Sequence, residues 1–202
     1  MIDIKSRAMG IYQNNCYLVK VEKGEIIIDP GVGAAEWIID NVSNPVAILN
    51  THGHFDHVWD NAKVKKELGI PIYCPRKDAF MLRNDPFGQG TPSSTPDYKV
   101  KEDEVIELGG VDIRFRHFPG HTPGNSVIEI EQHWFSGDFI FRHSIGRCDF
   151  PHSDTKEMIR SLERVIEIDD EYILHPGHGP STTLKEERRY LPFWITELNR
   201  GI

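Results

Sequence analysis

The feature that most constrains this chain is a dense group of metal-binding side chains in residues 51–57. His52, His54 and His57, together with Asp56, stand almost side by side in a chain that has ten histidines among its 202 residues. Histidine is the commonest metal ligand among side chains, and carboxylates often accompany it. An apolar run precedes the group and an amphipathic run follows it. The stretch therefore predicts one half of a metal site, placed just after a buried strand.

Length and composition predict one globular domain over residues 1–202. Hydrophobic residues make up 39% of the chain and charged residues 27%, as in ordinary soluble proteins. The formal net charge is −8 and no basic stripe offsets it, so nucleic acid is not an expected partner. No apolar run reaches membrane length and no signal-peptide pattern begins the chain, so no membrane partner is expected either. The sequence does not indicate an oligomeric state.

Cysteine usage predicts a reducing compartment. Cys16, Cys74 and Cys148 are widely spaced, no CxxC motif occurs, and an odd number does not make a disulfide framework. We therefore expect free thiols in a cytoplasmic protein.

The first half of the chain reads as strands separated by helices. Strands are expected at residues 2–8, 16–21, 26–28, 46–50 and 71–74. Helices are expected at residues 34–41, 60–68 and 75–82. The segment 83–101 is rich in Pro, Gly, Ser and Thr, and its length favours a lid loop beside a site.

The second half repeats this arrangement. Strands are expected at residues 104–108, 111–116, 126–131, 134–136 and 172–174, and helices at 155–168 and 184–198, the last broken or kinked at Pro192. The turns at residues 22–25 and 109–110 are hairpin signals, which require antiparallel neighbours. We therefore predict an α/β (α+β) fold of two sheets packed face to face with helices outside, rather than one doubly wound parallel sheet.

Three later residues can complete the metal site. His121, Asp138 and His178 each follow a predicted strand directly, and each has a glycine immediately before it, which lets the backbone turn sharply. The predicted ligand set is His52, His54, Asp56, His57, His121, Asp138 and His178.

The ligand types suggest two metal ions. One ion would take His52, His54 and His121, and the other Asp56, His57 and His178, with Asp138 shared between them. Zn²⁺ is the expected metal, with iron or manganese as alternatives. A hydroxide bridging two such ions would be a nucleophile at neutral pH without any serine or cysteine.

Other polar residues receive weaker predictions. Asp29 ends a buried strand, where it either supports the metal site from behind or simply caps a turn. The remaining histidines are interpreted as surface residues: His117, His133, His143, His152 and His175.

The order of these ligands resembles the metallo-β-lactamase fold superfamily. The pattern His52-x-His54-x-Asp56-His57, followed by His121, Asp138 and His178, carries the resemblance from about residue 10 to 185. The resemblance implies a four-layer αβ/βα sandwich with the metals at one edge. Family members that hydrolyse β-lactams generally have a cysteine where this chain has Asp138, so that activity is not the one expected.

Two segments resemble the glyoxalase II group within this superfamily, namely residues 137–151 and 176–188. The resemblance implies hydrolysis of an acyl thioester such as S-lactoylglutathione. Full-length glyoxalase II has a C-terminal helical domain that binds glutathione, whereas only 24 residues follow His178 here, so the thiol carrier stays open. The alternatives are a persulfide dioxygenase with one iron held like His52, His121 and Asp138, and a non-catalytic metal-binding protein.

The resemblance also suggests roles for individual residues. Asp56 and Asp138 are the expected catalytic carboxylates, with Asp56 both binding metal and orienting the hydroxide. Arg147 is the candidate for holding a substrate carboxylate, because a guanidinium binds carboxylates with two parallel hydrogen bonds. An ion pair with Asp149 is the equal alternative for Arg147. Cys148 is expected to lie close to the pocket.

Overall fold

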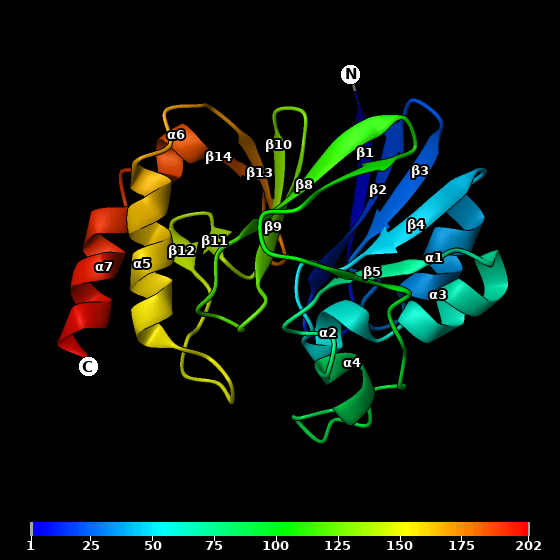
Figure 1. Ribbon diagram of the computed structural model, residues 1–202, viewed down its shortest axis with the longest axis horizontal. Helices are drawn as coiled ribbons and strands as arrows, with labels where there is room; N and C mark the ends of the chain where they lie inside the picture. The colour runs from blue at the N-terminus through cyan, green and yellow to red at the C-terminus, as the bar shows by residue number, and fades with distance from the viewer. Residues whose placement is uncertain (1, 202) are drawn as a thin grey trace.

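Two six-stranded β-sheets pack face to face in the structure, a computed structural model that describes residues 2–201 (Figure 1). The first sheet contains, in spatial order, β1 (Asp3–Met9), β2 (Asn14–Val21), β3 (Gly24–Ile28), β4 (Pro45–Leu49), β5 (Ile72–Pro75) and β6 (Tyr98–Val100). Strands β1, β2 and β3 pair antiparallel, and β3, β4, β5 and β6 pair parallel. The sheet is therefore mixed, as the hairpin signals required.

The second sheet has the spatial order β14-β13-β10-β9-β8-β7. Its strands are β7 (Val105–Leu108), β8 (Val111–His117), β9 (Ser126–Ile130), β10 (His133–Gly137), β13 (Ile173–Pro176) and β14 (Thr182–Thr183). Only β10 and β13 pair parallel in this sheet. A separate hairpin consists of β11 (Ile140–Phe141) and β12 (Ser144–Ile145).

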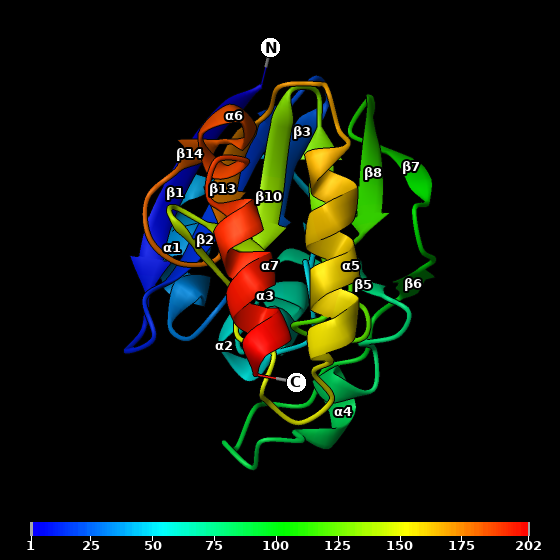
Figure 2. The ribbon, with the colours of Figure 1, turned by 90° about the vertical axis from the view of Figure 1, so that its left-hand side faces the viewer.

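Helices cover the outer face of each sheet. Figure 1 shows α1 (Ala34–Asn41) and α3 (Asn61–Leu68) on one side, and α5 (Thr155–Ile166) and α7 (Leu191–Arg200) on the other. In Figure 2, α5 and α7 lie across the strands of the second sheet. The short helices are α2 (Phe55–Val58), α4 (Met81–Asn84) and α6 (Leu184–Glu187). The predicted two-sheet sandwich with outer helices is confirmed.

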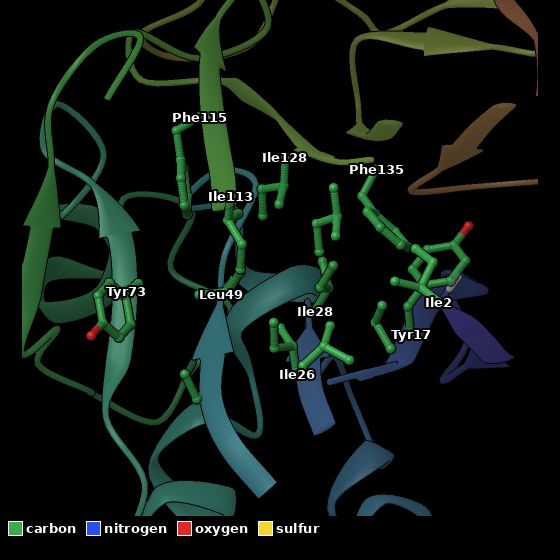
Figure 3. Packing of buried hydrophobic residues seen from close by; sticks show 14 of the residues in the cluster. Ile2, Tyr17, Ile26, Ile28, Leu49, Tyr73, Ile113, Phe115, Ile128 and Phe135 are labelled. Atoms are coloured by element: carbon green, nitrogen blue, oxygen red, sulfur yellow. The ribbon is translucent and has the colours of Figure 1, made fainter. Parts of the chain in front are cut away.

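Strand periodicity explains the layers. Side chains alternate between the two faces of a strand, so Ile26 and Ile28 of β3 face the second sheet while Ile27 faces the helices. Figure 3 shows the inward side chains, among them Ile28, pointing toward Ile113 and Ile128 of the other sheet. Burial of both faces accounts for the run of three isoleucines at residues 26–28 of β3.

Two further apolar layers hold the helices in place. Ile38 of α1 and Val64 of α3 pack with Ile27 on the outside of the first sheet. On the outside of the second sheet, Leu162 of α5 packs with Trp134 of β10. Within the described residues, no helix is both long and apolar enough to cross a bilayer.

The prediction of a helix at residues 75–82 is wrong. Pro75 ends β5, residues 76–80 form turns, and only Met81–Asn84 are helical. Asp78 explains the difference, because its side chain is fully buried and accepts hydrogen bonds from Gly53 and Gly124 in two other loops. These tertiary bonds override the local helical pattern. The predicted loop 83–101 likewise contains the end of α4 and the short strand β6.

The C-terminal helix is interrupted, as expected, but slightly before Pro192. Helix α6 ends at Glu187 and α7 begins at Leu191, so Pro192 lies in the first turn of α7. A proline is tolerated there because its missing N–H would have no partner inside the helix.

Truncating a residue between the sheets tests this packing. Phe115 is completely buried in the inter-sheet layer. We expect Phe115→Ala to lower the free energy of unfolding by ~4 kcal/mol, because the lost burial and the cavity left behind both destabilise the core. Urea unfolding followed by circular dichroism measures the change. Phe193→Ala on α7, whose ring is 56% exposed, is the control and should shift the midpoint little. A loss of similar size in both variants would contradict the layer assignment.

Candidate metal centre

Strand direction brings the predicted ligands to one edge of the sandwich. In the first sheet, β3 and β4 run parallel and lead to Asp29 and to residues 51–57. In the second sheet, β8, β10 and β13 all point the same way, because β9 is antiparallel to both β8 and β10. These three strands lead to His121, Asp138 and His178. Helix α2, which carries Asp56 and His57, lies at this edge (Figure 1).

The first ligand group contains His52, His54 and His121. One nitrogen from each ring lies within 4.8 Å of the corresponding atoms of the other two. The ring centroids of His54 and His121 are 4.4 Å apart, and all three side chains are buried. Three imidazoles at this spacing can hold one divalent ion and leave a position open.

The second ligand group contains Asp56, His57 and His178, again with ligand atoms within 4.8 Å of one another. The Nε2 atom of His178 is 3.3 Å from Oδ2 of Asp56, and Nε2 of His57 is 3.7 Å from the same oxygen. Asp138 lies between the two groups. Its oxygens are 3.5 Å from Nε2 of His121 on one side, and 3.3 Å and 3.5 Å from Nε2 of His57 and His178 on the other.

Asp29 supports this arrangement from behind. Its carboxylate accepts hydrogen bonds from the backbone N–H and hydroxyl of Thr51, at 2.8 and 2.6 Å, and lies 2.9 Å from Nδ1 of His57. Asp29, His52 and His57 could also form a ligand group by distance alone. We assign Asp29 the supporting role because its oxygens are already used by these bonds. Its backbone has φ 51°, a left-handed conformation that aspartate tolerates better than most residues.

Hydrogen bonds hold the imidazole rings in one orientation. Nδ1 of His121 donates to the backbone carbonyl of Arg147 at 2.6 Å, and Nδ1 of His52 lies 3.0 Å from Oγ1 of Thr51. With Nδ1 of His57 facing Asp29, three rings are anchored through Nδ1 and present Nε2 to the centre. Such anchoring is characteristic of metal-binding histidines.

The buried nitrogens that face the centre make no hydrogen bond, although oxygens of Asp138 lie 3.3 Å from Nε2 of His57 and 3.5 Å from Nε2 of His121. Among the described residues, the buried polar atoms without a hydrogen bond include Nε2 of His52, His54, His57 and His121, and Oδ1 of Asp138. An unpaired buried polar group costs on the order of 1–3 kcal/mol. Five such atoms converging on one place fit bound cations, and the donor set of imidazoles and carboxylates suits divalent metals.

The electrostatic environment differs between the two groups of histidines. Burial, together with the neighbouring His121, lowers the pKa of His54 to about 3, and burial also holds the pKa of His52 well below its ordinary value. Burial opposes ionisation of Asp138, but His57 outweighs it and keeps the pKa of Asp138 well below the usual range. The carboxylates of Asp138, Asp56 and Asp29 instead raise the pKa of His57 well above its ordinary value, against the effect of burial. His52 and His54 are therefore neutral and ready to bind a metal, whereas His57 carries a proton that a metal must displace.

Glycines allow the ligand loops to pack this closely. Gly137, just before Asp138, has φ 51°, and a Cβ atom there would lie 2.4 Å from Oγ1 of Thr51. A Cβ on Gly177, just before His178, would lie 2.3 Å from Oδ1 of Asp138. Both positions therefore need glycine for close approach.

Sequence reasoning missed Asp78, which joins two of the ligand loops. Its Oδ2 accepts from the N–H of Gly53, at 3.1 Å, and from the hydroxyl of Thr122, at 2.5 Å. Its Oδ1 accepts from the N–H of Gly124 at 2.6 Å. Burial raises the pKa of Asp78 to about 6, although these hydrogen bonds act to lower it. Gly53 separates two of the proposed ligands and Thr122 follows a third, so Asp78 spans both sides of the first group.

Arg147 makes the ion pair considered for it, while its role toward a substrate stays a prediction. Its guanidinium makes a two-bonded ion pair with Asp149, at 2.9 and 2.8 Å, and lies 4.3 Å from the ring centre of Phe150. It also lines the cavity above the metal centre. Cys148 lines a neighbouring cavity, shared with α7, rather than this one. Cys16 and Cys74 are buried, Cys148 is half-buried, and all three are free thiols.

Of the five histidines expected at the surface, His117 and His133 are half-buried and His175 is buried. His175 is buried, its Nε2 lies 3.0 Å from Nδ1 of His133, and the two rings stack. The expectation is wrong for His175 because its ring packs between the sheets against Tyr17 and Phe135. His143 and His152 are exposed, and His117 is half-buried.

Replacing Asp78 tests its role as a connection between loops. We expect Asp78→Asn to lower the free energy of unfolding by ~3 kcal/mol, because the amide NH₂ would face a backbone donor and leave it unpaired. Urea unfolding measures the loss, and metal analysis after gel filtration measures retention, which should also fall. The exposed Asp112→Asn is the matched control. Full stability and full metal content in Asp78→Asn would show that the three bonds do not support the centre.

Comparison with known proteins agrees with this geometry. A family model described as the metallo-beta-lactamase superfamily matches residues 9–178. A Haemophilus influenzae protein named hydroxyacylglutathione hydrolase GloC is 37% identical over 198 residues, which cover 90% of this chain and 93% of that protein.

Solved structures show the same fold over nearly the whole chain. The crystal structure of BLEG-1, a B3 metallo-beta-lactamase, has a TM-score of 0.84 and 29% identity, covering 95% of this chain and 99% of that one. The crystal structure of TTHA1623 in a di-iron-bound form has a TM-score of 0.82 and 34% identity, covering 94% and 99%. With the family model spanning all seven candidate ligands, this chain belongs to the metallo-β-lactamase superfamily.

Proposed function

We propose that this metallo-hydrolase cleaves an acyl thioester with two metal ions, as the glyoxalase II group does. The observation that carries the proposal is the position of Asp138, whose oxygens lie 3.3–3.5 Å from nitrogens of both ligand groups. A carboxylate in that position suits a pair of ions rather than a single one. Zn²⁺ is the metal we expect, and the di-iron form of TTHA1623 makes iron the first alternative.

The chain supplies positioning and charge around the reaction. When bound, the ions supply Lewis acidity and lower the pKa of a coordinated water toward neutrality. Asp56 and Asp138 line the cavity, so each can orient that water toward a substrate carbonyl. The leaving thiolate needs no general acid at neutral pH, because thiols ionise near pH 8.5. Arg147 can hold a substrate carboxylate if it releases Asp149.

The name of the Haemophilus influenzae relative supports thioester chemistry, since a hydroxyacylglutathione hydrolase acts on such a bond. A persulfide dioxygenase would use His52, His121 and Asp138 alone and leave the second ligand group without a role, so we rank this function second.

The free thiols support a cytoplasmic location. We also propose that residues 83–101 act as a lid, since Phe87 and Gln89 line the cavity.

Removing one ligand from the set tests the assignment. We expect His54→Ala and Asp138→Ala each to lower thioester hydrolysis by about 100-fold or more and to reduce bound metal. Hydrolysis is followed by release of free thiol, and metal content by atomic emission. His152→Ala, at an exposed histidine, serves as control. Full activity in either variant would contradict the assignment of that residue as a metal ligand.

Metal content and substrate together separate the alternatives. We expect about two equivalents of zinc and turnover of thioesters, with S-lactoylglutathione as the first assay. One equivalent of iron, with oxygen uptake on glutathione persulfide, would instead support the dioxygenase. Metal binding without either reaction would support a non-catalytic protein.

The protonation of His178 predicts a pH dependence for metal loading. Burial disfavours its charged form, but hydrogen bonds to Asp138 and Asp56 outweigh burial and raise the pKa of His178 to about 9. A metal ion must displace this proton, so affinity at the second group should rise by up to about tenfold per pH unit between pH 7 and 9. Chelator competition on metal-free protein measures it. His178→Ala should reduce this pH dependence but not abolish it, because the pKa of His57 in the same group is also raised. An unchanged slope would contradict the role of His178.

A further inference from the structure

The cavity above the metal centre has a wall of aromatic rings. The ring centroids of Tyr12 and Phe55 are 5.0 Å apart, those of Phe55 and Phe87 5.8 Å, and those of Phe87 and Phe150 6.0 Å. All four residues line a cavity of about 470 Å³ that opens onto the ligands. They come from four separate segments, so the tertiary structure builds the wall.

This wall reaches the reacting centre itself. The ring of Phe87 is 4.8 Å from the ring of His54, and that of Phe150 is 5.9 Å from it. On the other side of the cavity, the ring of Phe141 is 6.0 Å from that of His178. The groups that flank a carbonyl held at the metals would therefore touch apolar surface on both sides.

The loop that carries Phe87 is internally tied. The carboxylate of Asp85 accepts hydrogen bonds from the N–H of Gly90, at 2.7 Å, and from the hydroxyl of Thr91, at 3.0 Å. A turn closed in this way holds Phe87 against His54 before any ligand arrives. A preformed apolar wall favours ligands that bury apolar surface against it.

The cavity offers little lysine or arginine to pair with the carboxylates of a substrate. Of the described residues that line it, Arg147 is the sole lysine or arginine. That guanidinium is already paired with Asp149 through two hydrogen bonds. An S-acylglutathione carries two carboxylates and one ammonium group, and the paired guanidinium of Arg147 offers no free charge to either carboxylate.

We propose that the preferred substrate is a thioester whose acyl group carries an aromatic ring or a bulky aliphatic chain beside the carbonyl. This rests on the thioesterase function proposed above. The acyl group lies against Phe87 and Phe150. Water forms the new C–O bond, the C–S bond breaks with its electron pair leaving on sulfur, and the products are a carboxylate, a thiol and one proton.

Physical chemistry gives the direction of the preference. A ring on the acyl group loses apolar surface to water against the wall, which is favourable in proportion to the area buried. The lactoyl group is smaller and brings a hydroxyl next to these rings. Hydrophobic pockets distinguish such groups by about 10–200-fold.

Four thioesters form the test on zinc-loaded protein: lactoyl and phenylacetyl groups, each carried on glutathione and on N-acetylcysteamine. We expect kcat/KM for phenylacetyl to exceed that for lactoyl by about tenfold or more on either thiol. N-acetylcysteamine should also serve at least as well as glutathione. A higher kcat/KM for S-lactoylglutathione than for both phenylacetyl thioesters would overturn the proposal and leave thioesterase function standing.

Matched variants locate the preference in the wall. Phe87→Ala and Phe150→Ala should each lower the phenylacetyl-to-lactoyl ratio by about fivefold or more, whereas Phe87→Leu should retain most of it. Phe193→Ala, an exposed ring on α7, should leave the ratio unchanged. Circular dichroism shows whether each variant folds. An unchanged ratio in folded Phe87→Ala and Phe150→Ala would overturn the placement of the acyl group.

A binding measurement separates this inference from the proposed function. Ketone analogues, in which a methylene replaces the thioester sulfur, cannot be hydrolysed and can be titrated by calorimetry. Failure of every thioester to react would overturn the proposed function. The phenylacetyl ketone should still bind about tenfold more tightly than the lactoyl ketone, and equal binding would overturn the inference about the wall.

Discussion

The structure depends on burying imidazole nitrogens that no protein group satisfies. Nε2 of His52, His54, His57 and His121 converges on one place at the edge of the sandwich without a hydrogen-bond partner among the described residues. Such a cluster is costly unless cations occupy it, so metal binding and folding stability are linked here.

Two buried carboxylates outside the proposed ligand set hold the cluster in shape. Asp29 anchors Thr51 and the ring of His57, while Asp78 joins the N–H of Gly53 to the loop that follows His121. Both act on the backbone or on the far side of a ring, so neither needs to touch a metal. Ligand geometry therefore depends on contacts between segments far apart in sequence.

The candidate metal centre and the cavity wall determine different properties of the site. The ligands determine what kind of bond can be attacked, and the superfamily uses similar centres for several reactions. The wall determines what can lie next to the centre. Here Phe87 and Phe150 border the first ligand group, and Arg147, the one arginine or lysine among the described lining residues, is already paired. Substrate choice in this chain is thus a matter of packing more than of charge.

The sequence by itself determined the two-sheet fold, because strand periodicity and hairpin turns are local patterns. It also identified the candidate ligands, four of which stand together in the motif at residues 51–57. The roles of those ligands and the single domain stay predictions. Only the tertiary structure decided the rest. The local pattern around Asp78 predicted a helix. The three hydrogen bonds that prevent one come from other loops, so the pattern could not reveal them. The wall from Tyr12 to Phe150 could not be predicted, since its rings meet only when four distant segments fold together.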